Sequence, residues 1–286
     1  MKTAMMAAAL LAAVSTDASA ATIFGVDENN NLVTFDSSSP GTFLSSVRIT
    51  GADSSFEALD FRPLNNMLYG LTANRVVHMI DTATGVASAV SGRLAIDGSV
   101  FGFDFNPTID RVRIVSNTDN NYVFNPNDGS LTGAPTTTSL GYASGDVNAG
   151  ANPGVSAAAY TTSTFGAAAS TTQLYVIDTD RDVLAKQNNN GGVLNTVGAL
   201  GVDLGSRTSF DISGTDAFAF NGNTLYRADL GTGKLNAIGQ TNRALFGIAI
   251  QAVPEPATWA MMILGFGVVG YSMRRRQATV RMPQAI

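Results

Sequence analysis

Cysteine is absent from the chain, and charged residues make up only 14% of it. The absence of cysteine excludes disulfides, thiolate metal sites and cysteine nucleophiles together. The low charge is unusual, because about a quarter of the residues of a typical globular protein are charged. Glycine, serine, threonine and asparagine take the place of the missing charges, which is typical of extracellular β proteins with many turns.

Histidine occurs once, as His78, so a histidine-rich zinc site is excluded. A Ser-His-Asp triad would have to use this residue, and no Gly-x-Ser-x-Gly elbow accompanies any serine. His78 lies within residues 76–80, a predicted strand. We therefore interpret it as a structural residue of a strand and not as a catalytic base.

Basic residues are few once the two ends of the chain are set aside. Residues 21–252 contain 12 basic and 20 acidic residues, a net charge of −8, and no basic patch or stripe. The phosphate backbone of a nucleic acid would be repelled by this body. DNA or RNA binding is therefore not expected.

Residues 1–20 have the pattern of a secretory signal peptide. Lys2 supplies a small positive region, and residues 4–14 form an uncharged apolar run that is too short to span a bilayer as an anchor. Ala18 and Ala20 are the small residues that signal peptidase requires just before its cleavage site. We predict a cut between Ala20 and Ala21.

Residues 253–286 form a second targeting segment. Two closely spaced prolines break any preceding strand, and residues 257–273 then carry no charge, a length at the short end of what spans a bilayer as a helix. The basic cluster at residues 274–276 follows at once and places that end of the helix in the cytoplasm. We therefore expect a precursor anchored in the inner membrane, with residues 21–252 in the periplasm.

This order of features closely resembles the PEP-CTERM sorting signal, the tag that exosortase enzymes of Gram-negative bacteria recognise. The resemblance implies that an exosortase-type membrane enzyme binds and processes the chain near the PEP tripeptide, and such tags accompany exopolysaccharide and biofilm systems. Residues 277–286 depart from the pattern, because these signals normally end at the arginines. A plain stop-transfer anchor without processing is the alternative. The matching residues are Pro254, Glu255, Pro256, Trp259, Arg274, Arg275 and Arg276.

Internal repeats indicate the fold of residues 21–252. Three turns, beginning at Asp81, Asn125 and Asp229, share an Asp or Asn in first place and a Gly four residues later. The first side chain caps such a turn, and the glycine takes the position with positive φ. Each turn ends a series of predicted strands, and the series recurs about every 45 residues, which is typical of the four-stranded blades of a β-propeller.

The two ends of this body complement each other. Residues 22–49 contain only three predicted strands, and residues 245–251 contain a lone strand of the kind that begins a blade. Residues 155–197 form a less regular unit, and residues 141–154 and 163–172 are predicted loop insertions. We predict an all-β propeller of about five four-stranded blades, closed by pairing of the terminal strands, plus the C-terminal transmembrane helix. A β-sandwich is the alternative.

Two short motifs carry a second resemblance. Residues 59–63, Leu-Asp-Phe-Arg-Pro, and residues 68–71, Leu-Tyr-Gly-Leu, resemble a bacterial family catalogued as domain of unknown function 4394. The resemblance covers about residues 21–251. It implies a propeller-like fold and supplies no activity.

Three acids, Asp60, Asp104 and Asp211, occupy equivalent positions in three predicted inner strands. One interpretation makes them metal ligands or paired acids around a central channel. The other makes them structural, since a buried carboxylate is tolerated when backbone amides of the neighbouring blade donate to it. We favour the structural interpretation.

Asp178, Asp180 and Asp182 have the spacing that begins a calcium-binding loop. Val183 stands where that loop requires glycine, and Asn189 stands where it requires a bidentate glutamate. The segment also fits a hairpin turn. We expect no cofactor, with Ca²⁺ as the one candidate metal.

No pair of acids is marked as the acid and base of a glycosidase, and residues 21–252 contain only two glutamates, Glu28 and Glu57. We expect a non-enzymatic envelope or matrix protein whose propeller binds or scaffolds exopolysaccharide or envelope proteins. After processing it would lie at the outer surface or outside the cell. The alternative is a secreted carbohydrate-active or other hydrolase. Carboxylates that converge in a pocket with a shielded floor would favour the hydrolase, and a lining of serine, threonine and backbone would favour binding.

Overall fold

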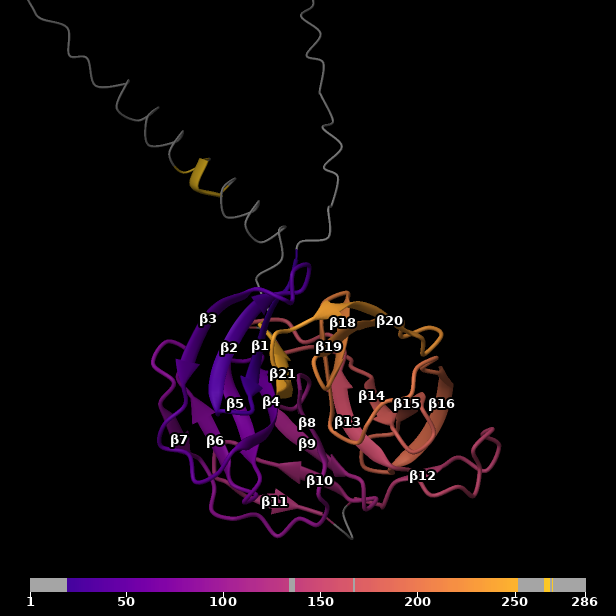
Figure 1. Ribbon diagram of the computed structural model, residues 1–286. Helices are drawn as coiled ribbons and strands as arrows, with labels where there is room; N and C mark the ends of the chain where they lie inside the picture. Colours follow the sequence, from indigo (N-terminus) through magenta and orange to yellow (C-terminus); the bar gives the residue numbers. More distant parts are fainter. Residues whose placement is uncertain (1–19, 134–136, 167, 252–264, 268, 270–286) are drawn as a thin grey trace, which may run out of the picture.

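The computed structural model describes residues 20–133, 137–166, 168–251, 265–267 and 269. Five small sheets stand around a central axis as the blades of a propeller (Figure 1). Each blade is built on an antiparallel meander of four strands, and the first strand of each lies next to the axis. The predicted all-β propeller of about five blades is confirmed.

The strands are given for each blade from the axis outward. Blade 1 consists of β21 (Leu245–Ile250), β1 (Thr22–Asp27), β2 (Asn31–Asp36) and β3 (Phe43–Arg48). Blade 2 consists of β4 (Phe56–Arg62), β5 (Met67–Thr72), β6 (Val77–Ile80) and β7 (Ala87–Ala89). Blade 3 consists of β8 (Phe101–Asn106), β9 (Arg111–Ser116), β10 (Asn121–Phe124) and β11 (Leu131–Thr132). Blade 4 consists of β13 (Val155–Tyr160), β14 (Leu174–Asp178), β15 (Val183–Gln187), β16 (Val193–Ala199) and β12 (Gly141–Tyr142). Blade 5 consists of β17 (Thr208–Ser213), β18 (Asp216–Asn221), β19 (Thr224–Ala228) and β20 (Leu235–Gln240).

Blade 1 closes the ring, because it contains both ends of the body. β1 pairs with β21 in antiparallel register, so that Ile23 lies opposite Ile250 and Phe24 opposite Ala249. The predicted closure by the terminal strands is therefore confirmed. Closure matters for stability, because pairing of the two terminal strands completes a blade that neither end of the body could form alone.

Blade 4 differs from the prediction at its outer edge. The first two residues of the predicted loop 141–154 form β12, which pairs in parallel with β16. A two-residue bridge has no apolar alternation of its own, so the sequence pattern could not show it.

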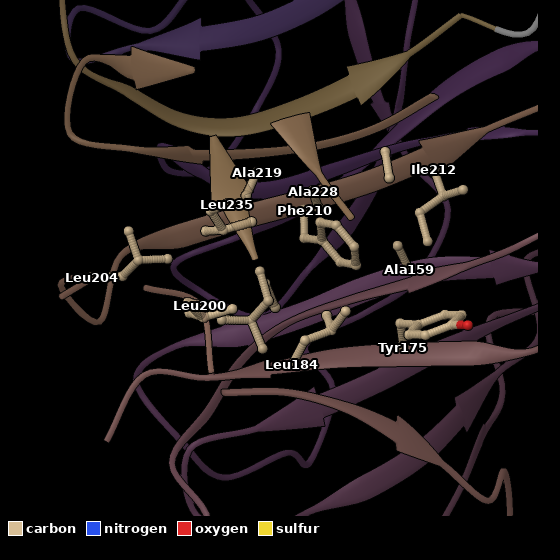
Figure 2. Packing of buried hydrophobic residues seen from close by; sticks show 13 residues of the cluster. Ala159, Tyr175, Leu184, Leu200, Leu204, Phe210, Ile212, Ala219, Ala228 and Leu235 are labelled. Carbon is tan, nitrogen blue, oxygen red and sulfur yellow. The ribbon is translucent and has the colours of Figure 1, made fainter. Parts of the chain in front are cut away.

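Five hydrophobic clusters hold the blades together, one at each boundary between neighbours. Figure 2 shows the cluster between blades 4 and 5, where Ala159 and Leu184 face Phe210 and Leu235. Each fully buried Leu, Val or Phe side chain contributes about 1.5–3 kcal/mol relative to exposure. With no disulfide in the chain, this packing is the main source of stability.

Small residues let the inner strands approach one another near the axis. A Cβ atom on Gly102 of β8 would lie 2.6 Å from the backbone nitrogen of Ala158 on β13. A Cβ atom on Gly247 of β21 would lie 3.2 Å from the Cα atom of Ala58 on β4. Both contacts are with backbone, which cannot rotate away as a side chain can. Only glycine fits at Gly102 without a shift of the neighbouring blade.

Most of the targeting segments lie outside the described residues. Residues 265–267 and 269 are helical, and within the described part of the chain no helix is long and apolar enough to cross a membrane. The predicted transmembrane helix at residues 257–273 is otherwise outside that part, as are Ala18 and all seven residues of the sorting motif. Ala20 is exposed, and the N–H of Ala21 donates to Ser37 Oγ at 3.0 Å.

Candidate functional site

The central channel brings together the three acids that the sequence places on inner strands. Each carboxylate crosses a blade boundary and accepts a backbone N–H of the next inner strand. Asp60 accepts from Phe105 at 2.6 Å, Asp104 from Tyr160 at 2.9 Å, and Asp211 from Ile250 at 2.5 Å. These are the inter-blade hydrogen bonds of the structural interpretation.

Alanine takes the equivalent position in blades 1 and 4, at Ala249 and Ala159. No side chain at that position can therefore serve the corresponding amide of the next strand. Asp211 supplies the acceptor that Ala159 cannot, since its own Oδ1 accepts the N–H of Ile212 at 2.6 Å. Asp60 does the same in place of Ala249, since a hydrogen bond from the backbone N–H of Phe61 stabilises the charged form of Asp60. The three carboxylates thus satisfy buried amides of all five blades around the axis.

Charge is concentrated in this cluster. Asp60, Asp104 and Asp211 are only 6%, 2% and 4% exposed, and each offers an oxygen within 4.8 Å of the others. Burial, followed by the charges of its acidic neighbours, raises the pKa of Asp60 and of Asp104 well above the usual value. Burial raises the pKa of Asp211 to about 6. Three negative charges so close together need neutralisation, which shared protons or a hard cation would supply.

A pocket opens at the end of the channel where the inner strands begin. It is a shallow pocket of about 310 Å³, counting the space open to solvent, and lies between blades 1, 2, 3 and 5. The acid cluster lies about 10 Å deeper, because Asp60 follows Glu57 by three residues and a strand rises about 3.3 Å per residue. We call this pocket the mouth. Its lining residues are Glu57, Ser99, Val100, Phe101, Arg207, Thr208 and Phe246.

Glu57 and Arg207 are the charged residues that line the mouth, and Arg75 lies near enough for its charge to act on Glu57. Burial raises the pKa of Glu57, while the positive charges of Arg207 and then Arg75 act against that shift. The guanidinium of Arg207 lies over the ring of Phe246, 4.9 Å from its centroid. Arg75 donates to the carbonyl of Gly98 at 3.1 Å, and its buried Nε has no hydrogen-bond partner among the described residues. The mouth therefore offers one guanidinium donor, one carboxylate acceptor and an aromatic ring.

Arg207, Arg75 and Phe246 were not identified from the sequence, and Glu57 was named only as one of two glutamates. They come from blades 1, 2 and 5 and share no local motif. One signal could have found them. The blade repeat sets the depth of each residue along the axis, and residues three or four positions before the inner-strand acids meet at one end of the channel.

A loop covers much of the opposite end of the channel. It connects β13 to β14 and reaches two other blades, because Gly166 N–H donates to the carbonyl of Pro63 at 2.9 Å and Ala169 N–H to that of Pro107 at 3.2 Å. A second cavity, open to solvent and of about 560 Å³ with that open space counted, lies beneath it. The cavity is lined by Pro63, Leu64, Pro107, Thr108, Ile109, Asp110 and Ala168.

The three acids of the candidate calcium loop do not converge. Asp178 is fully buried, and it accepts the N–H of Asp180 at 3.0 Å and the hydroxyl of Tyr142 at 2.6 Å. Asp182 points elsewhere and accepts the N–H of Leu204 at 3.0 Å. Among the described residues, the one group of three or more candidate ligands close enough to share a metal ion is the channel cluster. The segment 178–182 is the hairpin turn between β14 and β15 and does not fit a calcium loop.

His78 lies on β6 and is 2% exposed. Its ring packs edge to face against Phe56, and its Nε2 lies 3.7 Å from Asp53 Oδ1. No serine hydroxyl donates to either ring nitrogen in the described hydrogen bonds. His78 therefore belongs to the packing between strands and is not among the residues that line the mouth.

The ring of five blades around a charged channel defines the chain as a five-bladed β-propeller. Residues 31–249 match the model of the family described as domain of unknown function (DUF4394), and the chain belongs to this family. Residues 252–276 match the PEP-CTERM protein-sorting motif. Both resemblances noted in the sequence are confirmed. The motif implies an exported, membrane-anchored precursor that an exosortase-type membrane enzyme processes.

Comparison with other proteins adds little about activity. The chain is similar to a solved structure of a structural genomics protein of unknown function from Bacteroides thetaiotaomicron. The two share 13% sequence identity and a TM-score of 0.49, and the similarity covers 83% of this chain and 68% of the other. A search of curated proteins finds no match.

Proposed function

We propose that this protein is a non-enzymatic binding or scaffolding propeller of the bacterial cell envelope or extracellular matrix. A signal peptide at residues 1–20 exports the chain, and signal peptidase removes it after Ala20. A helix at residues 257–273 then holds the precursor in the inner membrane, with Arg274, Arg275 and Arg276 in the cytoplasm. Processing at the PEP tripeptide releases the body to the outer surface or the matrix of a biofilm.

The burial and the backbone hydrogen bonds of the channel acids support a binding role. Convergent carboxylates above a covered floor are the arrangement expected of a hydrolase, and the channel has both features. However, the carboxylates are nearly inaccessible, and backbone amides of neighbouring blades occupy them. A glycosidase needs two carboxyl groups about 5–9 Å apart that a sugar can reach from solvent, whereas these three groups are only 2–6% exposed and offer oxygens within 4.8 Å of one another. The cluster therefore acts as part of the ring and not as an acid–base pair.

The mouth is the best candidate for ligand contact. The guanidinium of Arg207 can bind the hydroxyl or carboxylate groups of a polysaccharide, and Glu57 can accept from a sugar hydroxyl. The ring of Phe246 offers an apolar surface for the face of a sugar. Extracellular polysaccharide is therefore the proposed ligand, and envelope proteins are the other class of partner. No cofactor is proposed for this role.

A binding and hydrolysis assay separates the two functions. The mature protein would be titrated with extracellular polysaccharide purified from the producing bacterium, with release of reducing ends followed in parallel. We expect binding without hydrolysis, and a loss of affinity of about ten-fold or more in Arg207→Ala, since a charged hydrogen bond contributes about 1.5–3 kcal/mol. Arg48→Ala, on the exposed outer strand of blade 1, is the matched control. Hydrolysis that Asp104→Asn abolishes would establish the hydrolase instead.

A further inference from the structure

The chain leaves the propeller at a defined face. Every inner strand runs from the mouth to the opposite end of the channel, so Gln251, directly after β21, lies opposite the mouth. β1 begins at the same end, since Gln251 N–H donates to the carbonyl of Thr22 at 3.2 Å. We call this side of the propeller the exit face. Its central part consists of the turns that follow the inner strands.

Apolar side chains project from the central turns of the exit face. Leu64 and Ile109 are each 54% exposed, and Phe165 is 40% exposed. They come from three successive blades, and Leu64 and Ile109 line the cavity beneath the loop that contains Phe165. Large exposed apolar residues that gather on one face mark a surface that contacts another apolar phase.

Two acids within these central turns are neutralised by partners. Asp110 forms an ion pair with Arg62, whose Nε donates to Asp110 Oδ1 at 2.7 Å. Asp216 pairs with Arg227 at 2.7 Å. No charged residue occurs in the loop 161–172. Arg111, at the start of β9, donates to the carbonyls of Ile109 and Asp110 and forms no ion pair among the described residues, so the middle of the exit face is partly apolar and carries this one further positive charge.

The periphery of the exit face carries more acids than bases, with Lys234 beside Asp229 as the base of the blade 5 turn. The outer turns of blades 1, 2, 3 and 5 carry Asp36, Asp81, Asp128 and Asp229. Hydrogen bonds within the turns, chiefly from Thr84, Ser130 and Thr232 respectively, hold the pKa values of Asp81, Asp128 and Asp229 below the usual value. These groups are charged at neutral pH. An anionic surface would repel them, and a zwitterionic one would not.

The chain beyond Gln251 limits how far this face can move from the membrane. Residue 257, where the uncharged run of the sorting tail begins, lies only six positions after Gln251. A fully extended chain covers at most about 3.5 Å per residue, so the link spans about 20 Å or less. In a precursor whose tail crosses the bilayer, the exit face cannot turn away from the lipid.

We propose that the exit face of the precursor rests on a zwitterionic bilayer surface, with Leu64, Ile109 and Phe165 in contact with lipid and the mouth facing away from the membrane. This inference rests on the proposed function, because it requires the tail at residues 257–273 to anchor the chain. This orientation also suits the two sites of the precursor, the processing site and the ligand site. The processing site stays at the membrane, and the ligand site points outward.

Site-directed labelling tests this orientation cleanly, because the chain has no native cysteine. Full-length protein with Leu64→Cys, Ile109→Cys or the mouth control Ser99→Cys would carry a polarity-sensitive fluorophore. Each would be reconstituted into vesicles of phosphatidylethanolamine and phosphatidylcholine that contain spin-labelled lipid. We expect at least about three-fold stronger quenching at positions 64 and 109 than at 99, since spin labels quench only at close range. Replacing a third of the lipid with phosphatidylglycerol should reduce this quenching, because the acidic periphery is repelled.

The failures of this test are distinguishable. If the chain floats with the vesicles but position 99 is quenched as strongly as position 64, the orientation is overturned and the anchor stands. If the chain does not float with the vesicles, the tail is not an anchor, and the proposed function fails together with the orientation. In floating protein labelled at position 109, Leu64→Ser together with Phe165→Ser should weaken the quenching, and Val147→Ser, in the exposed loop that leads to β13 on the mouth side, should not. Equal effects of both changes would also overturn the proposal.

Discussion

The carboxylate of Asp104 accepts the backbone N–H of Tyr160 at 2.9 Å, across the boundary between blades 3 and 4. This bond joins two inner strands that share no ladder hydrogen bonds, since they belong to different sheets. Two further acids, Asp60 and Asp211, lie beside it, so the same side chain both ties two blades together and crowds negative charge into the channel. At Asp104, the hydrogen bond from Tyr160 therefore stabilises the fold, whereas repulsion from Asp60 and Asp211 destabilises it.

Two substitutions of Asp104 separate these effects. Asp104→Ala leaves the amide of Tyr160 buried without an acceptor, which costs about 1–3 kcal/mol. Asp104→Asn keeps an acceptor oxygen and removes the charge, so it should be at least as stable as the unchanged protein above about pH 7. Urea unfolding followed by circular dichroism measures both. Asp97→Ala, at an exposed position, should change the free energy of unfolding by less than about 0.5 kcal/mol.

The acid cluster also predicts how stability depends on pH. The pKa values of Asp60, Asp104 and Asp211 are raised in the folded protein by burial, and that of Asp211 reaches about 6. A raised pKa favours folding most below the unfolded value near 3.8, and the contribution is lost as the pH rises through the folded value. The urea midpoint should therefore fall between about pH 5 and about pH 8 in the presence of EDTA. For Asp27, burial raises the pKa, but hydrogen bonds from Asn31 and Arg243 outweigh burial and lower it. Ionised Asp27 therefore stabilises the fold above about pH 4, and this contribution is lost as the pH falls further.

Two controls decide whether the channel cluster is the cause. Asp104→Asn should flatten the pH dependence, since it removes one of the three interacting charges. A midpoint that does not change between about pH 5 and 8 would contradict the assignment. If the urea midpoint at about pH 8 is higher in Ca²⁺ than in EDTA, a bound cation neutralises the cluster at that pH in place of protons.

The repeat in the sequence was sufficient to predict the blades and the three channel acids, because equivalent positions of successive blades face the axis at the same depth. The repeat also sets the depth of the mouth residues along the axis, but it does not show which of them are neighbours. Glu57 and Arg207 come from blades 2 and 5, and only closure of the ring brings them together. The pattern at Asp178 left two interpretations open for a physical reason, since an acid that caps a hairpin turn and an acid that opens a calcium loop have the same spacing.

Close approach of the inner strands gives a prediction at Gly102. A Cβ atom there would lie 2.6 Å from the nitrogen of Ala158, so Gly102→Ala must push blades 3 and 4 apart. Overpacking of this kind costs about 1–3 kcal/mol. Gly141→Ala is the matched control, because a Cβ atom at that position would have no other atom within 4 Å. Thermal unfolding should show a lower midpoint for the first variant alone, and equal midpoints would mean that the blades adjust freely.

The sorting tail makes a prediction that separates export from processing. Pro254→Ala together with Pro256→Ala changes the tripeptide that the exosortase-type enzyme recognises and leaves the signal peptide intact. The variant should still begin at Ala21, whose N–H donates to Ser37 in the folded body, so cleavage after Ala20 leaves this contact in place. It should retain residues 274–286 and remain in the inner membrane, whereas the unchanged protein ends near Pro256. Mass spectrometry of fractionated cells measures both termini, and Pro283→Ala, beyond the arginines, is the control. Normal processing of the double variant would show that the enzyme does not read the tripeptide, and an unprocessed wild type would show that the tail is a permanent anchor.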